Sequence, residues 1–230
     1  MKALLERLEL AEANYSNDLE YRKRAMSFID NLKAFLPDYL DMLIKDRNGF
    51  YVLAEKFWDD PIAKDLYVFF APKGSHGSNV DAGVGKFKGS RALLLPFLNS
   101  SSDLSNIVDR IGFNSSVIVH ELIHLMDKGY LKGSVPNTST EKLYYNHASE
   151  WNAFWQEGAF KAENLANNPI INTKERWKRT IGLTFDEFKK RINYIWDKGF
   201  ISNMDDVTSK KFDKRLYQLW LEISKKIPKE

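Results

Sequence analysis

The sequence contains no cysteine and only four histidines among its 230 residues. Without cysteine the chain can form no disulfide framework, thiolate nucleophile, zinc ribbon or iron–sulfur cluster. Any metal ion would therefore be held by histidine and carboxylate side chains. The four imidazoles belong to His76, His120, His124 and His147.

An excess of charge of one sign is also missing. The 34 basic and 31 acidic residues leave a net charge of +3, and lysine and glutamate alternate along most of the chain. This balance creates no concentrated field for nucleic acid or for an anionic membrane, so we expect neither as a partner. With 43% hydrophobic and 28% charged residues, the composition is that of a soluble folded protein rather than a disordered one.

Long hydrophobic runs are absent as well. Glu6, Arg7 and Glu9 interrupt the apolar stretch that a signal peptide would need, and no segment approaches about 18 uncharged apolar residues. These absences predict a cytoplasmic protein without a membrane span. Release by a route without a signal peptide, or a place in a virion, is the alternative.

Glycines gather between residues 74 and 89, but they do not form a phosphate-binding loop. A Walker loop has glycine five positions before its Gly–Lys pair and serine or threonine directly after it, whereas Val80 and Phe87 stand there. The stretch instead predicts a hairpin or loop that leads into a strand over 91–97. Because Pro96 cannot donate a ladder hydrogen bond, this strand should lie at the edge of a sheet or end there.

Hydrophobic spacing predicts the other elements. Apolar residues at helical intervals indicate two helices within residues 2–40, interrupted at 15–18, and a third helix over 50–63. An aromatic, β-branched stretch closed by Pro72 indicates a strand over 65–71. Further helices are expected near 115–128, 146–168, 173–180, 184–197 and 209–226.

Together these elements predict one α+β domain over residues 1–230, mainly helical with a small mixed sheet. No internal repeat or low-complexity linker divides the chain. We expect a helical N-terminal part over 1–65 and a central part over 66–165 that holds the sheet and the functional helices. A helical C-terminal part should follow over 166–230.

The most informative segment contains the motif HExxH as His120-Glu121-Leu122-Ile123-His124. Residues four apart lie above one another on a helix, so both imidazoles can face one ion, with Glu121 beside them. The neighbouring positions are apolar, and a buried glutamate without a partner would cost several kcal/mol or stay protonated. A metal-bound water supplies such a partner. The segment therefore predicts a zinc site, against the alternative of a chance match on a polar surface helix.

A catalytic zinc ion needs a third protein ligand and an open position for water. The metzincin extension HExxHxxGxxH is excluded, because Asp127 and Tyr130 occupy its glycine and last histidine positions. A second pattern takes the third ligand from a glutamate on a following helix. Glu150 fits this pattern, because it lies 26 positions after His124 and is a charge within an apolar, aromatic run.

Three residues near these ligands are assigned with alternatives. His147 precedes Glu150 by one turn and is the alternative third ligand, a donor to the transition state, or a surface histidine. Asn146 is the expected N-cap of the Glu150 helix. Asp127 follows His124 on nearly the same stripe, where it could orient a zinc ligand by a hydrogen bond or simply end the helix.

These segments resemble the gluzincin clan of zinc metallopeptidases. The resemblance rests on His120 to His124 and on Ser149-Glu150-Trp151-Asn152-Ala153-Phe154, which is similar to the Glu-x-x-Ala helix of thermolysin-like enzymes. The lethal-factor and Pro-Pro endopeptidase group is similar through HExxHxxD, and the ImmA/IrrE-like proteases through Glu-x-x-x-Phe. The similarity covers about 35 residues and implies a zincin-like fold with the small mixed sheet beside the HExxH helix.

The resemblance implies a zinc-dependent endopeptidase with Zn²⁺ as cofactor and Glu121 as general base. In the lethal-factor-like pattern a tyrosine shortly before the ligand glutamate assists catalysis, and Tyr144 or Tyr145 stands near that place, with a packing role as the alternative. His147 is a further donor to the oxyanion. An edge strand before the motif helix would hold an extended peptide or protein substrate by strand addition. The candidate strand covers 90–97 and would bind through Ala92, Leu93, Leu94 and Leu95.

Two other classes of function are compatible with the same residues. A catalytically inactive structural or assembly protein, such as a virion component, could retain the fold and the ion. A target-specific protease effector could dock one protein with its long helices before cleaving it. A general peptidase should accept casein-like substrates, an effector should cut a single protein, and a structural protein should assemble without turnover.

Overall fold

The computed structural model divides the chain into two compact units. One, which we call the sheet unit, comprises residues 21–135, and the other, the helical unit, comprises residues 1–20 and 136–230. The border near residue 135 falls inside the part that was expected at 66–165. The structure describes residues 2–39, 44–45, 51–53, 66–72, 82–87, 89–98, 104, 106–126 and 140–229.

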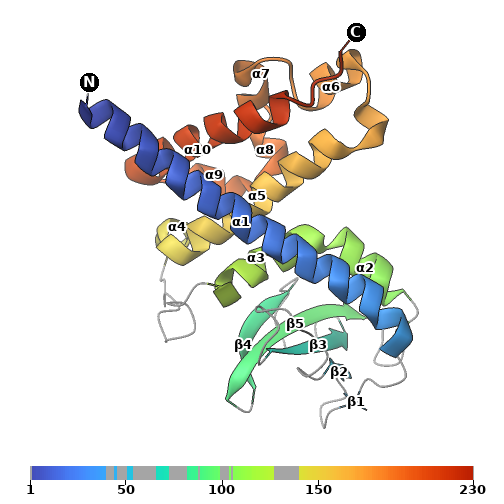
Figure 1. The fold of residues 1–230 in the computed structure, drawn as a ribbon. Coiled ribbons are helices and arrows are strands. Elements are labelled where there is room, and N and C mark those ends of the chain that lie inside the picture. The colour runs from blue at the N-terminus through green and yellow to red at the C-terminus, as the bar shows by residue number, and fades with distance from the viewer. Residues whose placement is uncertain are drawn as a thin grey trace. The chain divides into compact units, whose positions relative to one another are not determined.

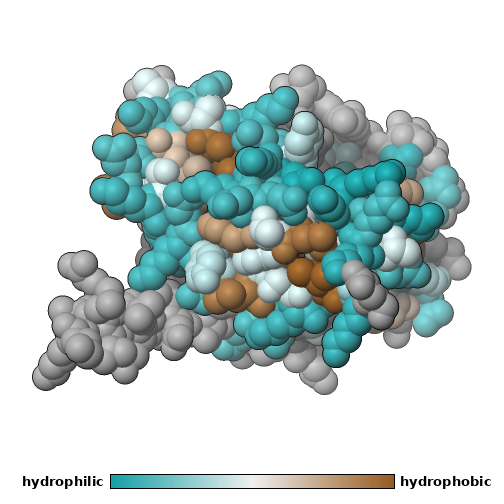
Figure 2. All heavy atoms as spheres, turned by 90° about the horizontal axis from the view of Figure 1, so that it is seen from above, coloured by the Kyte–Doolittle hydropathy of each residue, from teal (hydrophilic) through white to brown (hydrophobic). Residues whose placement is uncertain are grey.

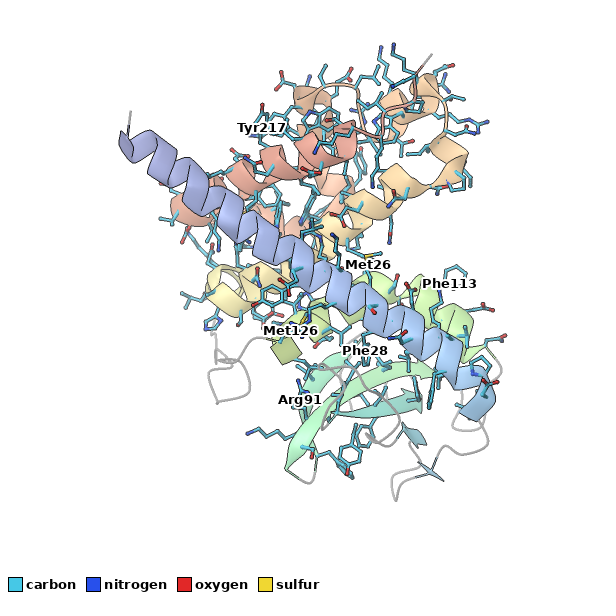
Figure 3. All side chains as sticks on the ribbon, in the orientation of Figure 1. Met26, Phe28, Arg91, Phe113, Met126 and Tyr217 are labelled. Atoms are coloured by element: carbon cyan, nitrogen blue, oxygen red, sulfur yellow. The ribbon has the colours of Figure 1, made fainter. Side chains whose placement is uncertain are left out.

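Helix α1 (Lys2–Tyr39) is one helix, although two were predicted within residues 2–40. The expected interruption at 15–18 contains neither proline nor glycine. Serine, asparagine and aspartate inside a helix each cost only about 0.5 kcal/mol relative to alanine, so the helix continues through them. Within the sheet unit the buried apolar residues of α1 lie at helical intervals, and Figure 3 labels one of them, Phe28. They are Ala25, Phe28, Ile29, Leu32 and Leu36.

The sheet unit contains a five-stranded mixed sheet in the order β1-β2-β3-β5-β4 (Figure 1). Strands β3 and β5 are parallel, and the other neighbours are antiparallel. The predicted strands over 65–71 and 91–97 are confirmed as β3 and β5, and Gly89, with φ +86°, forms the turn of the predicted hairpin. The strands are β1 (Ile44–Lys45), β2 (Tyr51–Leu53), β3 (Leu66–Pro72), β4 (Gly83–Phe87) and β5 (Ser90–Leu98).

Strand β2 shows that the helix predicted over 50–63 was wrong at its start. Tyr51 pairs with Phe70 and Leu53 with Val68, so β2 adds an aromatic and aliphatic strand to the side of β3. Pairing with a buried neighbouring strand outweighs a helical spacing that is only local. The remaining residues of the expected helix, 54–63, lie outside the described residues.

Strand β5 is an inner strand, so its predicted edge position was wrong. It pairs with β3 over residues 91–95 and with β4 over residues 90–94. The register with β3 shifts directly after residue 95, where the missing N–H of Pro96 falls. Strand β5 nevertheless runs on to Leu98, which pairs with Pro72, so the strand does not end at Pro96 either. Among the described strands, β4 forms the edge on this side of the sheet.

Two helices, α2 (Ile107–Phe113) and α3 (Ser115–Met126), contact this sheet. Both contact β5, and α3 also contacts β4, which confirms a small mixed sheet beside the HExxH helix. Helix α2 was not predicted, because its seven residues are too few to display a helical period. The buried aliphatic residues of these elements are Leu93, Leu95, Ile107, Ile111, Ile118, Val119, Leu122, Ile123 and Leu125.

The helical unit holds seven α-helices after residue 136 among the described residues. Expected helices near 146–168, 173–180 and 209–226 are confirmed as α5, α6 and α10, whereas the run at 184–197 is divided into α7 and α8. The helices are α4 (Glu141–Asn146), α5 (Ala148–Asn167), α6 (Lys174–Thr180), α7 (Phe185–Lys189), α8 (Ile192–Ile195), α9 (Lys198–Asn203) and α10 (Asp206–Ser224), with a 3₁₀ turn η4 (Pro169–Ile171) between α5 and α6.

The core of the helical unit is aromatic. On α5 the rings of Trp151 and Trp155 stack with their centroids 6.2 Å apart, and Trp155 stacks on Trp196 at 5.6 Å. Phe212 of α10 meets both Trp155 and Trp196 edge to face at 5.5 and 5.3 Å. Gly158 makes this packing possible, because a Cβ atom there would lie 2.0 Å from Nε1 of Trp196.

Figure 2 shows one face of the molecule, on which hydrophilic side chains dominate and hydrophobic ones form smaller patches. None of the helices in the described part of the chain is both long enough and apolar enough to cross a membrane.

Candidate metal centre

Helix α3 brings the two histidines of the motif together. The Nε2 atoms of His120 and His124 lie 3.2 Å apart, and their rings meet edge to face with centroids 4.9 Å apart. Two nitrogens that each lie about 2.0–2.1 Å from a tetrahedral zinc ion are separated by about 3.4 Å, so this spacing fits chelation of one ion. The predicted geometry of the pair is therefore present within one helix.

The pair lies in an apolar setting. His120 and His124 are 7% and 2% exposed, and aliphatic residues of α3 are buried beside them. Glu121 is half-buried. Partial exposure of this kind suits a general base, which exchanges protons with water and acts in an enclosed site.

The C-terminal turn of α3 is held by the sheet. Arg91 of β5 donates a hydrogen bond from Nη1 to the carbonyl oxygen of Leu125 at 3.4 Å, and Figure 3 labels Arg91 and the neighbouring Met126. A cation at this end of a helix satisfies a terminal carbonyl and complements the helix dipole. Asp127, Gly129 and Tyr130 follow α3 but lie outside the described residues, so the predicted role of Asp127 remains a prediction.

In the helical unit, the first turn of α5 carries the predicted third ligand. Glu150 is 2% exposed and stands between two buried residues, Ser149 and Trp151. A carboxylate in the first turn of a helix is stabilised by the helix dipole. Burial of this depth nevertheless favours a nearby cation over solvent as the partner of the charge.

The N-cap of α5 is His147, and the prediction of Asn146 for this position was wrong. Asn146 is the last residue of α4, where its side chain connects three elements. Its Nδ2 donates to the carbonyl oxygen of Asn203 at 2.6 Å, and its Oδ1 accepts from the N–H of Asp205 and from Oγ1 of Thr208. These partners lie more than 55 positions away in the sequence, so no local signal could have predicted them.

His147 is half-buried, and its ring is engaged within its own turn. Nδ1 of His147 lies 2.7 Å from Oγ of Ser149, which is 6% exposed. Ser149 was not predicted as a functional residue. Its position two residues after the histidine was the available signal, because serine and threonine near an N-cap readily bond to local groups.

The two candidate tyrosines on α4 differ in their surroundings. The hydroxyl of Tyr145 donates to Oδ1 of Asp197 at 3.2 Å. Burial, followed by the negative charge of Asp197, raises the pKa of Tyr145 to about 12. Tyr144 contacts the rings of Tyr145 and Phe154 edge to face.

His120 and His124 of the sheet unit and Glu150 of the helical unit are all buried, and they are side chains of the kinds that hold metal ions. The strand residues predicted to bind substrate lie on the inner strand β5, so the prediction of edge-strand pairing there was wrong. These residues are Ala92, Leu93, Leu94 and Leu95. Comparisons of the chain with protein-family models, curated proteins and solved structures found no match.

Proposed function

We propose that this protein is a zinc-dependent endopeptidase of the gluzincin kind, with a zincin-like fold and with His120, His124 and Glu150 as zinc ligands. The observation that carries the proposal is the 3.2 Å spacing of two buried Nε2 atoms on a helix whose motif also supplies Glu121. The same spacing allows a hydrogen bond between the two imidazoles, but the motif that also places Glu121 beside them favours a chelated cation.

Glu150 is the preferred third ligand because its carboxylate is nearly fully buried, while His147 is half-buried and already engaged by Ser149. Two neutral imidazoles and one carboxylate would leave a bound Zn²⁺ ion with a net positive charge and one position open. This is the composition that hydrolytic zinc sites use.

A bound Zn²⁺ ion would polarise the scissile carbonyl and lower the pKa of its water toward about 7. Glu121 would accept a proton from the attacking water and pass it to the leaving amine. Tyr144 or His147 would donate a hydrogen bond to the developing oxyanion. Tyr145 is a weaker choice for this role, because its hydroxyl donates to Asp197.

The proposed substrate is an extended peptide or protein. A peptidase site beside a sheet can hold such a chain through backbone hydrogen bonds at a free edge. Within the described strands β5 is paired on both sides, so Ala92 to Leu95 would shape the site as side chains of an inner strand and would not pair with the substrate backbone.

Metal analysis and digestion of a peptide library test this proposal. We expect about one Zn²⁺ ion per chain and peptide cleavage that stops on adding a chelator. A protein without zinc after gentle purification and zinc addition would refute the proposal. Zinc binding without cleavage of the library, followed by cleavage of one protein only, would instead identify a target-specific effector.

Comparison of Glu150→Ala with His147→Ala tests the third ligand. Glu150→Ala should weaken zinc binding about 10-fold or more, and His147→Ala should leave zinc in place. Zinc affinity can be measured by competition with a chromogenic chelator. If His147→Ala loses the metal while Glu150→Ala retains it, the site is a three-histidine centre and the gluzincin assignment is wrong.

A further inference from the structure

The N-terminus of α5 carries a histidine–serine pair, and the proposed mechanism gives a role to the histidine but none to the serine. Nδ1 of His147 and Oγ of Ser149 are 2.7 Å apart, a short distance for a bond between neutral groups. Ser149 is 6% exposed, so water competes little for its hydroxyl. One nitrogen of the His147 ring is therefore occupied by a buried partner.

The backbone on both sides fixes the base of this imidazole. The N–H of His147 donates to the carbonyl oxygens of Leu143 and Tyr144 at 3.1 and 3.2 Å, and its carbonyl oxygen accepts from the N–H of Trp151 at 2.8 Å. His147 thus ends α4 and begins α5 at the same time. Little freedom remains for the ring except rotation about its own side-chain bonds, which the bond to Ser149 restricts.

The position at an N-cap favours one tautomer. His147 makes no side-chain cap hydrogen bond, but the positive end of the α5 dipole favours an acceptor atom there over a second donor. Nδ1 is therefore better placed as an acceptor, with the hydroxyl of Ser149 as donor. The proton of the neutral ring then resides on Nε2.

We propose that Ser149 is a positioning residue that holds His147 as the Nε2–H tautomer, so that His147 donates from Nε2 to the oxyanion formed on the scissile peptide. The catalytic part of this inference rests on the proposed peptidase function. The tautomer part rests only on the contact between the two side chains and on the position of His147 at the start of α5.

A double-mutant cycle on Ser149 and His147 tests the catalytic part with the zinc-loaded full-length protein and a cleaved library peptide. Ser149→Ala should lower kcat about three- to tenfold with KM unchanged, since one neutral hydrogen bond is lost. Ser149→Thr, which keeps the hydroxyl, should recover most of the rate. In the His147→Ala background, Ser149→Ala should have no further effect. An equal loss in both backgrounds would overturn the role of Ser149 through His147.

Nitrogen NMR of the His147 ring tests the tautomer without any activity. At about pH 8, wild type should show a protonated Nε2 and an unprotonated Nδ1, and Ser149→Ala should show a mixture. A ring protonated on Nδ1, or one unchanged by Ser149→Ala, would overturn the inference. A zinc-loaded wild type that cleaves nothing would refute the peptidase and the oxyanion role together, while the NMR result still decides whether Ser149 sets the tautomer.

Discussion

The two imidazoles of α3 could be predicted from the sequence because their relation is local. Four positions along a helix bring His120 and His124 onto one face whatever the rest of the chain does, and the structure has their Nε2 atoms at 3.2 Å. Ser149 near His147 is equally local, but a serine close to an N-cap is too common to single out. At the scale of residues, then, the sequence predicted a contact only where two side chains are a few positions apart on one helix and form a distinctive pair.

Replacement of Glu121 by glutamine separates metal binding from chemistry. The amide keeps the size of the side chain but cannot accept a proton, so Glu121→Gln should retain zinc and lose peptide hydrolysis about 10²–10⁴-fold. Zinc content and turnover of the same preparation provide the measurement. Turnover within twofold of wild type would contradict the general-base role.

Gly158 and Gly112 form a matched pair for testing the aromatic core. Glycine to alanine inside a helix normally stabilises by about 1 kcal/mol. Gly112→Ala should follow this rule, because a Cβ atom there meets no atom within 4 Å. Gly158→Ala should destabilise, because its Cβ would lie 2.0 Å from Nε1 of Trp196, which is buried in a stack. Denaturant unfolding measures whether each variant raises or lowers the free energy of unfolding. An increase for Gly158→Ala would mean that the Trp196 stack is not formed.

At the scale of elements, α4 is held by contacts that are distant in sequence. Asn146 joins it to the end of α9 and the start of α10, and Tyr145 joins it to Asp197, the N-cap of α9. Because α4 leads directly into His147 and α5, these contacts fix the chain just before the proposed ligand Glu150.

The ionisation of Tyr145 reports on this attachment. Its pKa is raised to about 12, whereas an unfolded tyrosine ionises near 10, so the folded state holds the phenol proton more tightly. The resulting contribution to stability is present below about pH 10 and is lost as the pH rises through about 12. Phenolate absorbance of wild type minus that of Tyr145→Phe should therefore show a step near pH 12. A step near pH 10 would indicate that Tyr145 is neither buried nor held by Asp197 in the way the structure has it.

Sequence patterns predicted elements well where a local period decides them and less well where pairing does. Helices α3, α5 and α10 followed from spacing alone, and β3 from its aromatic and branched residues. The spacing of residues 51–53 predicted the start of a helix, but they form a strand because they pair with β3 through backbone hydrogen bonds. The position of β5 inside the sheet likewise depends on β4, which pairs with it across a glycine turn. Strand order is a property of several segments, so no single segment reveals it.

At the scale of the whole molecule, the two units have cores of different composition. Leucine, isoleucine and valine dominate around α2, α3 and β5, whereas tryptophan and phenylalanine dominate around α5 and α10. Phe212 touches the rings of Trp155, Trp196 and Phe200, so Phe212→Ala should lower the free energy of unfolding by about 3–5 kcal/mol. Guanidinium unfolding followed by circular dichroism tests this, and a loss below about 1 kcal/mol would contradict the packing around Phe212.

The distribution of tryptophan also has an optical consequence. Five of the six tryptophans of the chain, Trp151, Trp155, Trp177, Trp196 and Trp220, belong to the helical unit, and all five are buried. Indole emission shifts to longer wavelength when a buried ring meets water, so the intrinsic fluorescence of this protein is chiefly a signal from the helical unit. Added zinc that perturbs this emission would reveal binding near α5, on which Glu150 and Trp151 are adjacent, without any label on the chain.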